Sequence, residues 1–188
     1  KAIRIYEELE DNRRLHYSYN LLGIIARGQK QYDKAIEYYK TSRKYIDKLN
    51  DDRFRWSNQN NIAHVILSKE DYDLAKSTYK TLLNDSDLPI RYPKVYGLSL
   101  ASYTYARFKS GERGNNLNEK YKEVLDLYER IDNDDDIARI HQFLAELLIA
   151  QEKPNQALEE AKLALNLAVE KQSNERQLEV LRLLTELD

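Results

Sequence analysis

Cysteine is absent from this chain of 188 residues, and glycine, proline and tryptophan are scarce. The lack of cysteine excludes disulfides, thiolate metal sites and cysteine nucleophiles, and it leaves the redox compartment open. Only 5 glycines and 3 prolines occur, so long stretches are free to be helical. No apolar run approaches the roughly 18 residues that a membrane-spanning helix needs, and no signal-peptide pattern is present.

Neither sign of charge predominates. The chain has 30 Lys and Arg against 32 Asp and Glu, for a net charge of -2. Charges of both signs are interspersed, which is typical of a solvated helical surface. The basic stripe of a nucleic-acid-binding protein is missing. We therefore expect no nucleic acid to be bound directly by this region, and no membrane span within it.

Apolar residues recur at spacings of 3 and 4, which predicts helices, and no run of alternating β-branched residues predicts a strand. The helices are expected in pairs, joined by short polar turns. The first helices of the pairs are predicted at about 12–28, 52–68, 92–109 and 135–151, and the second helices at about 31–49, 71–83, 115–131 and 154–171. Two further helices are predicted at 1–10 and 174–188.

A small residue recurs in both helices of each pair. The first-helix positions are Gly23, Ala63 and Ala145, and a small partner follows twelve residues later in each case, at Ala35, Ala75 and Ala157. The gap between the second and fourth pairs places a degenerate third repeat at Tyr103, with Leu117 as its second-helix partner. The period is thus about 40 residues, and such a period indicates a repeat architecture.

These residues resemble the tetratricopeptide repeat, whose pattern combines a first-helix Leu-Gly with later Ala and aromatic positions. The matches are Leu22-Gly23, Ala35 and Tyr39, then Ile62-Ala63, Ala75 and Tyr79, and finally Leu144-Ala145, Ala157 and Ala161. The family period is 34 residues, so the helices here must be longer. The resemblance implies an all-α fold, a right-handed α-solenoid of antiparallel helix pairs, in which neighbouring pairs bury one another's apolar faces.

We interpret residues 1–188 as a single domain of this type. A partial repeat is expected at 1–11, four repeats at about 12–50, 51–90, 91–132 and 133–172, and a terminal helix at 174–188. The chain starts at Lys1 and not at an initiator Met, which suggests a piece of a longer protein.

Catalytic and metal-binding patterns are missing. The histidines His16, His64 and His141 are far apart in sequence, and no HExxH motif exists. Asp132, Asp134 and Asp136 match the start of a calcium loop, but Ile137 stands where that loop needs glycine. These aspartates are interpreted as a solvated turn that caps the next helix. We expect no metal, no cofactor and no enzymatic activity.

The resemblance implies that the first helices line the ligand-binding concave face. Amide side chains there can bond a peptide backbone, and arginines can bind a carboxylate with two hydrogen bonds. The candidate peptide-binding residues are Tyr17, Asn20, Arg27, Asn60, His64, Thr104, Arg107, Phe108, Arg139 and Gln142.

The favoured function is a non-catalytic scaffold that binds a protein or peptide on that face. The alternative is a sensory or regulatory input domain of a membrane-tethered bacterial signalling protein with a kinase or helix-turn-helix output, on either the cytoplasmic or the periplasmic side. A homodimer is a further expectation. An enzyme or enzyme subunit is the third hypothesis, and no nucleophile–base pair or cofactor loop favours it.

Overall fold

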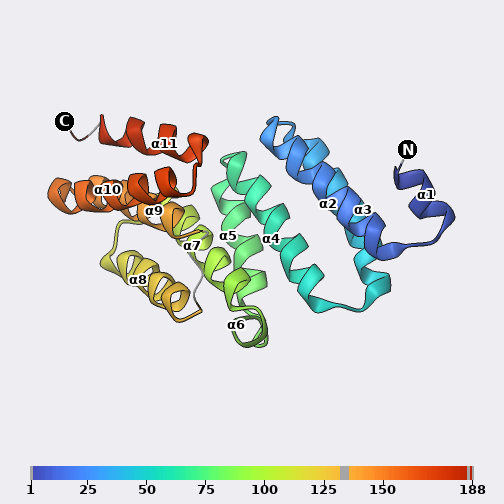
Figure 1. The fold of residues 1–188 in the computed structure, drawn as a ribbon. Helices are drawn as coiled ribbons and strands as arrows, with labels where there is room; N and C mark the ends of the chain where they lie inside the picture. Colours follow the sequence, from blue (N-terminus) through green and yellow to red (C-terminus); the bar gives the residue numbers. More distant parts are fainter. Residues whose placement is uncertain (1, 132–135, 186, 188) are drawn as a thin grey trace. The chain divides into compact units, whose positions relative to one another are not determined.

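The computed structural model describes residues 2–131, 136–185 and 187. Within them the chain forms eleven helices and no strands (Figure 1). The helices are α1 (Ala2–Glu8), α2 (Asn12–Gly28), α3 (Tyr32–Leu49), α4 (Asp52–Ser68), α5 (Tyr72–Leu83), α6 (Leu88–Arg91), α7 (Pro93–Lys109), α8 (Asn115–Arg130), α9 (Ile137–Ala150), α10 (Pro154–Glu170) and α11 (Asn174–Leu184). The all-α class is confirmed, and the paired helices lie within about two residues of the ranges expected from the sequence.

Two helices differ from the expectation. The short helix α6 was not predicted, because a four-residue segment carries no usable periodicity. The terminal helix ends at Leu184, earlier than the predicted Asp188. The predicted aspartate cluster falls on residues 132–135, which lie outside the described residues, apart from Asp136.

The chain divides into two compact units, residues 1–95 and 96–188. In the first unit α2 packs on α3, α3 on α4 and α4 on α5, and Figure 1 shows these helices side by side. In the second unit α8 packs on α9, α9 on α10 and α10 on α11. Each unit is therefore built from consecutive helix pairs stacked on their neighbours, as the repeat pattern predicts.

Aspartate side chains begin three of the helices in the first unit. The carboxylates of Asp11, Asp51 and Asp71 accept hydrogen bonds from the backbone N–H groups of the first turns of α2, α4 and α5. These bonds satisfy donors that have no partner inside the helix. The helix starts are thus fixed locally, by side chains next to each turn.

The turns inside the helix pairs share one backbone conformation. Their middle residues Lys30, Glu70 and Glu152 have positive φ angles of 58°, 62° and 58°. The next N–H donates back to a carbonyl five residues earlier, as from Gln31 to Ala26 at 2.8 Å. This is the usual left-handed termination of a helix, here without glycine. Because the turn is repeated, the two helices of each pair meet in the same register.

The second helices bury one recurring set of positions. In α3 the buried residues are Ala35, Tyr39, Ser42 and Ile46. The four equivalent residues of α8 and α10 are buried as well, and so are the first three in the shorter α5. Their spacing of 4, 3 and 4 residues is one face of a helix. The predicted small or apolar positions Ala35, Ala75, Leu117 and Ala157 are all completely buried.

The first helices bury a second recurring set, and this set corrects the third repeat. Ala63 and Ala145 are completely buried, as predicted, and so is Thr104. The assignment of Tyr103 to this position is wrong by one residue, because Tyr103 is only partly buried. The Thr104 hydroxyl donates to the carbonyl of Leu100 at 2.8 Å, which allows a polar side chain to be buried there.

Gly23 shows why the small position matters in the first repeat. A Cβ atom placed there would lie 2.5 Å from Cε1 of Tyr39. Ala26, Ala35 and Tyr39 form a buried cluster with Val65 of the next repeat. The missing side chain of Gly23 thus lets the Tyr39 ring fill the space between the paired helices.

Candidate functional site

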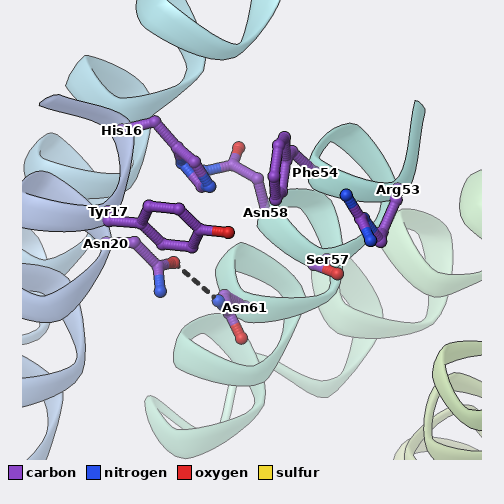
Figure 2. A pocket seen from close by; sticks show the side chains of 8 residues that line it. All are labelled: His16, Tyr17, Asn20, Arg53, Phe54, Ser57, Asn58 and Asn61. Carbon is purple, nitrogen blue, oxygen red and sulfur yellow. Dashed lines mark hydrogen bonds between the residues drawn. The ribbon is translucent and has the colours of Figure 1, made fainter. Parts of the chain in front are cut away.

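A pocket of about 280 Å³ lies between α2 and α4, the first helices of the first two repeats. Figure 2 shows side chains from both helices converging on it. The helices run in the same direction, because the contacts Tyr17–Phe54, Asn20–Asn61 and Arg27–His64 ascend together along both. The lining residues are His16, Tyr17, Asn20, Arg53, Phe54, Ser57, Asn58 and Asn61.

Three aromatic rings form one wall of the pocket. The ring of Tyr17 meets that of Phe54 edge to face, with 5.6 Å between centroids. His16 packs against both rings, at 4.8 Å from Tyr17 and 4.5 Å from Phe54. Phe54 is buried, whereas Tyr17 is 51% exposed, and Figure 2 shows its side chain reaching from α2 toward α4. The wall offers an apolar surface that is partly open to solvent.

His16 is a buried, neutral part of this wall. Its Nδ1 lies 2.8 Å from Oγ of Ser42, and that hydroxyl also contacts the His16 carbonyl at 3.2 Å. Because serine has one hydroxyl hydrogen, both bonds form together when His16 Nδ1–H donates to Oγ and the hydroxyl donates to the carbonyl. Burial lowers the pKa of His16, against a smaller raising effect of Asp51. The ring therefore brings no charge to the pocket at neutral pH.

Asn58 closes the pocket beside His16. Its Nδ2 donates to the backbone carbonyl of Tyr39 at 2.9 Å, which ties α4 to α3. Its Oδ1 is buried and has no hydrogen-bond partner among the described residues. A buried acceptor without a donor is unfavourable, so the Nδ2 bond is what holds this side chain in place.

Asn20 and Asn61 form an amide pair across the pocket. Nδ2 of Asn61 donates to Oδ1 of Asn20 at 3.0 Å, which Figure 2 marks as a dashed line. Nδ2 of Asn20 and Oδ1 of Asn61 have no partner within the part of the chain that the structure describes. If both amides were turned over, one donor and one acceptor would still be left. This pair can therefore bond both the C=O and the N–H of a peptide unit.

A second amide pair, in the other unit, has a different arrangement. Asn118 and Gln151 exchange two hydrogen bonds, at 3.2 and 2.9 Å. Gln151 also donates to the carbonyl of Arg113 at 2.9 Å. These groups are used within the fold, in contrast to those of Asn20 and Asn61.

The structure brings together four of the ten predicted site residues. Tyr17 and Asn20 line the pocket, and about two helical turns further along α2 the guanidinium of Arg27 donates to Nδ1 of His64 at 2.9 Å. These residues of α2 and α4 share one continuous face.

Four other predicted residues are buried inside the fold. They are Asn60, Thr104, Phe108 and Gln142, so their side chains do not lie on a surface that a ligand can reach. Gln142 accepts a hydrogen bond from Arg176 at 2.8 Å. Asn60 and Gln142 occupy equivalent positions, both among the buried residues of the first helices.

The last two predicted residues are paired with carboxylates. The guanidinium of Arg107 donates to Glu112 at 3.0 and 2.7 Å, and Arg139 lies 3.8 Å from Asp136. Arg107 therefore anchors the longer turn of the third repeat to α7. Neither residue lies in the described pocket.

Sequence reasoning did not propose several residues that build the surface of the first helices. In the second unit the Tyr105 hydroxyl donates to Glu146 at 2.8 Å, and its ring stacks on Phe143 at 4.0 Å. In the first unit His16 and Phe54 were missed. The corrected register would have found Tyr105, because it is equivalent to His64 and Glu146.

The described residues contain no group of three or more His, Asp or Glu side chains that could hold a metal ion. No helix among them is both long enough and apolar enough to cross a bilayer. The chemistry that the pocket offers is hydrogen bonding by amides and packing against aromatic rings.

Comparisons with known proteins agree with this architecture. The sequence model of the tetratricopeptide repeat family matches residues 16–42, which cover most of α2 and the first part of α3. The predicted resemblance is thus confirmed, and the chain contains a tetratricopeptide repeat. Such repeats generally mediate interactions between proteins, and proteins built from them are typically non-catalytic scaffolds.

A solved structure with detectable similarity is that of a thermophilic tetratricopeptide-repeat protein from Thermus thermophilus. It is 16% identical, the alignment covers 90% of this chain and 99% of that one, and the TM-score is 0.44. No match was found among curated proteins.

Proposed function

We propose that this chain is a non-catalytic scaffold that binds an extended peptide segment of another protein on the face shared by α2 and α4. The amide pair of Asn20 and Asn61 carries the proposal. Its uncommitted donor and acceptor complement one peptide unit, and peptide units are the group that every protein partner offers.

The size of the pocket supports a peptide over a metabolite. Sites for small molecules and cofactors usually measure about 300–1,000 Å³ and enclose most of the ligand. The pocket here holds about 280 Å³ and is open to solvent along Tyr17. It therefore suits one side chain of a longer ligand, whose backbone continues along the helices past the Arg27–His64 contact.

The experiment is a selection of peptides from a phage-displayed library of random twelve-residue sequences on the immobilised protein. Selected peptides are then measured against Asn20→Ala/Asn61→Ala and against the control Asn118→Ala, which breaks the amide pair that is used within the fold. We expect peptides that lose about tenfold or more in affinity on the first variant and keep it on the second, because the double substitution removes two neutral hydrogen bonds to the peptide, each worth roughly 0.5–1.5 kcal/mol.

Peptides that bind both variants as tightly as the original protein would contradict the proposal, and so would a selection that yields no binder. Circular dichroism of both variants checks that the helices are retained.

The regulatory-input alternative and the homodimer stay predictions. The coding sequence beyond Asp188 tests the first: a transmembrane helix followed by an output domain would support it, and a stop codon at that point would remove it. Sedimentation of the purified chain tests the second.

A further inference from the structure

Two arginines from different repeats converge on one ring of the pocket. The guanidinium of Arg53, in α4, lies 4.9 Å from the centroid of Phe54. The guanidinium of Arg13, in α2, lies 5.7 Å from the same centroid. The aromatic ring attracts both cations, but two like charges close together repel each other.

Only one of these two positive charges is balanced nearby. Arg53 donates to Asp51 at 3.1 Å, and the neighbouring Arg14 pairs with Asp11 at 3.4 Å. Arg13 has no ion pair among the described residues. The mouth of the pocket therefore has an excess of one positive charge, on an exposed side chain.

The N-termini of the two helices do not add to this charge, because carboxylates already cap them. Arg13 and Arg53 lie in the first turns of α2 and α4, and both helices point the same way. The positive ends of the two helix dipoles consequently lie at the same end of the pocket, where Asp11 and Asp51 already accept hydrogen bonds from the first turns. The preference for a further negative charge therefore rests on Arg13. His16, on the pocket wall, is neutral and therefore adds no charge of its own.

The spacing of residues along α2 sets the order of contacts along a ligand. Arg13, Tyr17 and Asn20 follow one another on α2 over seven residues, or roughly 10 Å along the helix axis. An extended peptide covers that length in about three residues. A carboxylate at Arg13, an apolar side chain against Tyr17 and a peptide unit at Asn20 then fall on successive parts of one strand.

We propose that the pocket binds an acidic peptide segment in which an aspartate or glutamate stands two residues from an apolar residue, so that both side chains lie on the same face of the extended peptide. The apolar side chain packs against the exposed part of the Tyr17 ring, and the side-chain carboxylate is bound by Arg13 beside Arg53. This inference rests on the proposed function, and it adds the chemical class of the ligand.

The test uses capped peptides on the whole chain, so that no terminal charge contributes. The probes are Ac-Gly-Ser-Glu-Gly-Leu-Ser-NH2 and Ac-Gly-Ser-Leu-Gly-Glu-Ser-NH2, each compared with its Glu→Gln form. Binding is followed by NMR titration of the 15N-labelled protein, which detects weak complexes. We expect the better Glu peptide to bind about 2- to 5-fold more tightly than its Gln form at low salt, in line with an exposed ion pair.

Two matched variants locate the charge. Arg13→Gln should remove the advantage of Glu over Gln, whereas Arg14→Gln should preserve it, because Arg14 is paired with Asp11 and lies over Tyr6. Added salt should reduce the advantage by screening. Both arginines are exposed, so neither substitution should disturb the fold.

Three results would overturn the inference. Equal binding of the Glu and Gln peptides would show that no carboxylate is recognised, and would leave the proposed function standing if both bind through Asn20. Tighter binding of Ac-Gly-Ser-Gly-Ser-Leu with a free C-terminus would assign the carboxylate to a chain end. Loss of the advantage in Arg14→Gln as much as in Arg13→Gln would make the effect a general one of net charge.

Discussion

Replacing Gly23 by alanine should destabilise the first unit, although alanine favours helices. Alanine in a helix interior gains about 1 kcal/mol over glycine. At Gly23, however, the added Cβ lies 2.5 Å from Cε1 of Tyr39 and 2.8 Å from Cδ1 and Cζ. These atoms belong to a ring that is almost completely buried, so the ring and the helix behind it must move.

Overpacking of this kind costs about 1–3 kcal/mol. Taking about 2 kcal/mol and subtracting the propensity gain, we expect Gly23→Ala to lower the free energy of unfolding by about 1 kcal/mol. The matched control is Gly28→Ala, because Gly28 is the last residue of the same helix, α2. No atom lies within 4 Å of a Cβ placed there, so the control should be unchanged or more stable by up to about 1 kcal/mol.

The assay is urea unfolding followed by tryptophan fluorescence. Trp56 is the single tryptophan, and it lies buried in α4, where its Nε1 donates to Asp85 at 2.8 Å. Its fluorescence therefore reports the unit that contains Gly23. The reasoning is refuted if Gly23→Ala unfolds at the same or a higher urea concentration than the original protein while Gly28→Ala does not differ from it.

Three further outcomes follow from the same contacts. Burial lowers the pKa of His16 in the folded protein, so on acidification the unfolded chain binds a proton before the folded one does. The urea midpoint reported by Trp56 should therefore fall as the pH drops below about 6.5. His16→Gln should reduce that fall. Lys30 has a φ of 58°, and Lys30→Gly should raise stability by roughly 0.5–1 kcal/mol in the same unfolding assay, because glycine adopts this conformation without strain. The Tyr105 hydroxyl lowers the pKa of Glu146 against the larger raising effect of burial, so Tyr105→Phe should raise that pKa further in a 13C NMR titration; an unchanged pKa would contradict the hydrogen bond.

The helices and their pairing could be predicted from the sequence because they depend on local patterns. Apolar spacing sets each helix, and Asp11, Asp51 and Asp71 mark where three of them begin. The buried residues Gly23 and Ala35 are twelve apart because the short turn at Lys30 fixes how the two helices meet. All of these local patterns are present in the single amino-acid sequence.

The third repeat could not be aligned in the same way. Its small position is occupied by Thr104, which reads as a surface residue, and the longer turn before Leu117 hides the one-residue shift. On a helix one residue is a rotation of about 100°. The one-residue error in the register therefore placed Thr104 on the predicted ligand-binding face of α7, although the neighbouring Tyr105 lies on that side of the helix.

The pocket itself was only partly accessible to sequence reasoning. Tyr17 and Asn20 were found because the register assigns them to the exposed side of a first helix. The contribution of Phe54 and Asn61 depends on how far α4 slides along α2, and that distance is set by packing between repeats. The place of Asn58 in the pocket likewise depends on its hydrogen bond to the carbonyl of Tyr39, which the sequence does not indicate.

The most direct test of the peptide-binding account is an NMR titration of the 15N-labelled protein with Ac-Gly-Ser-Glu-Gly-Leu-Ser-NH2. The account predicts that the largest shifts fall on the side-chain amides of Asn20 and Asn61 and on backbone amides near Tyr17 and Phe54. Shifts that are largest on other helices, with these two side-chain amides unmoved at saturation, would contradict it.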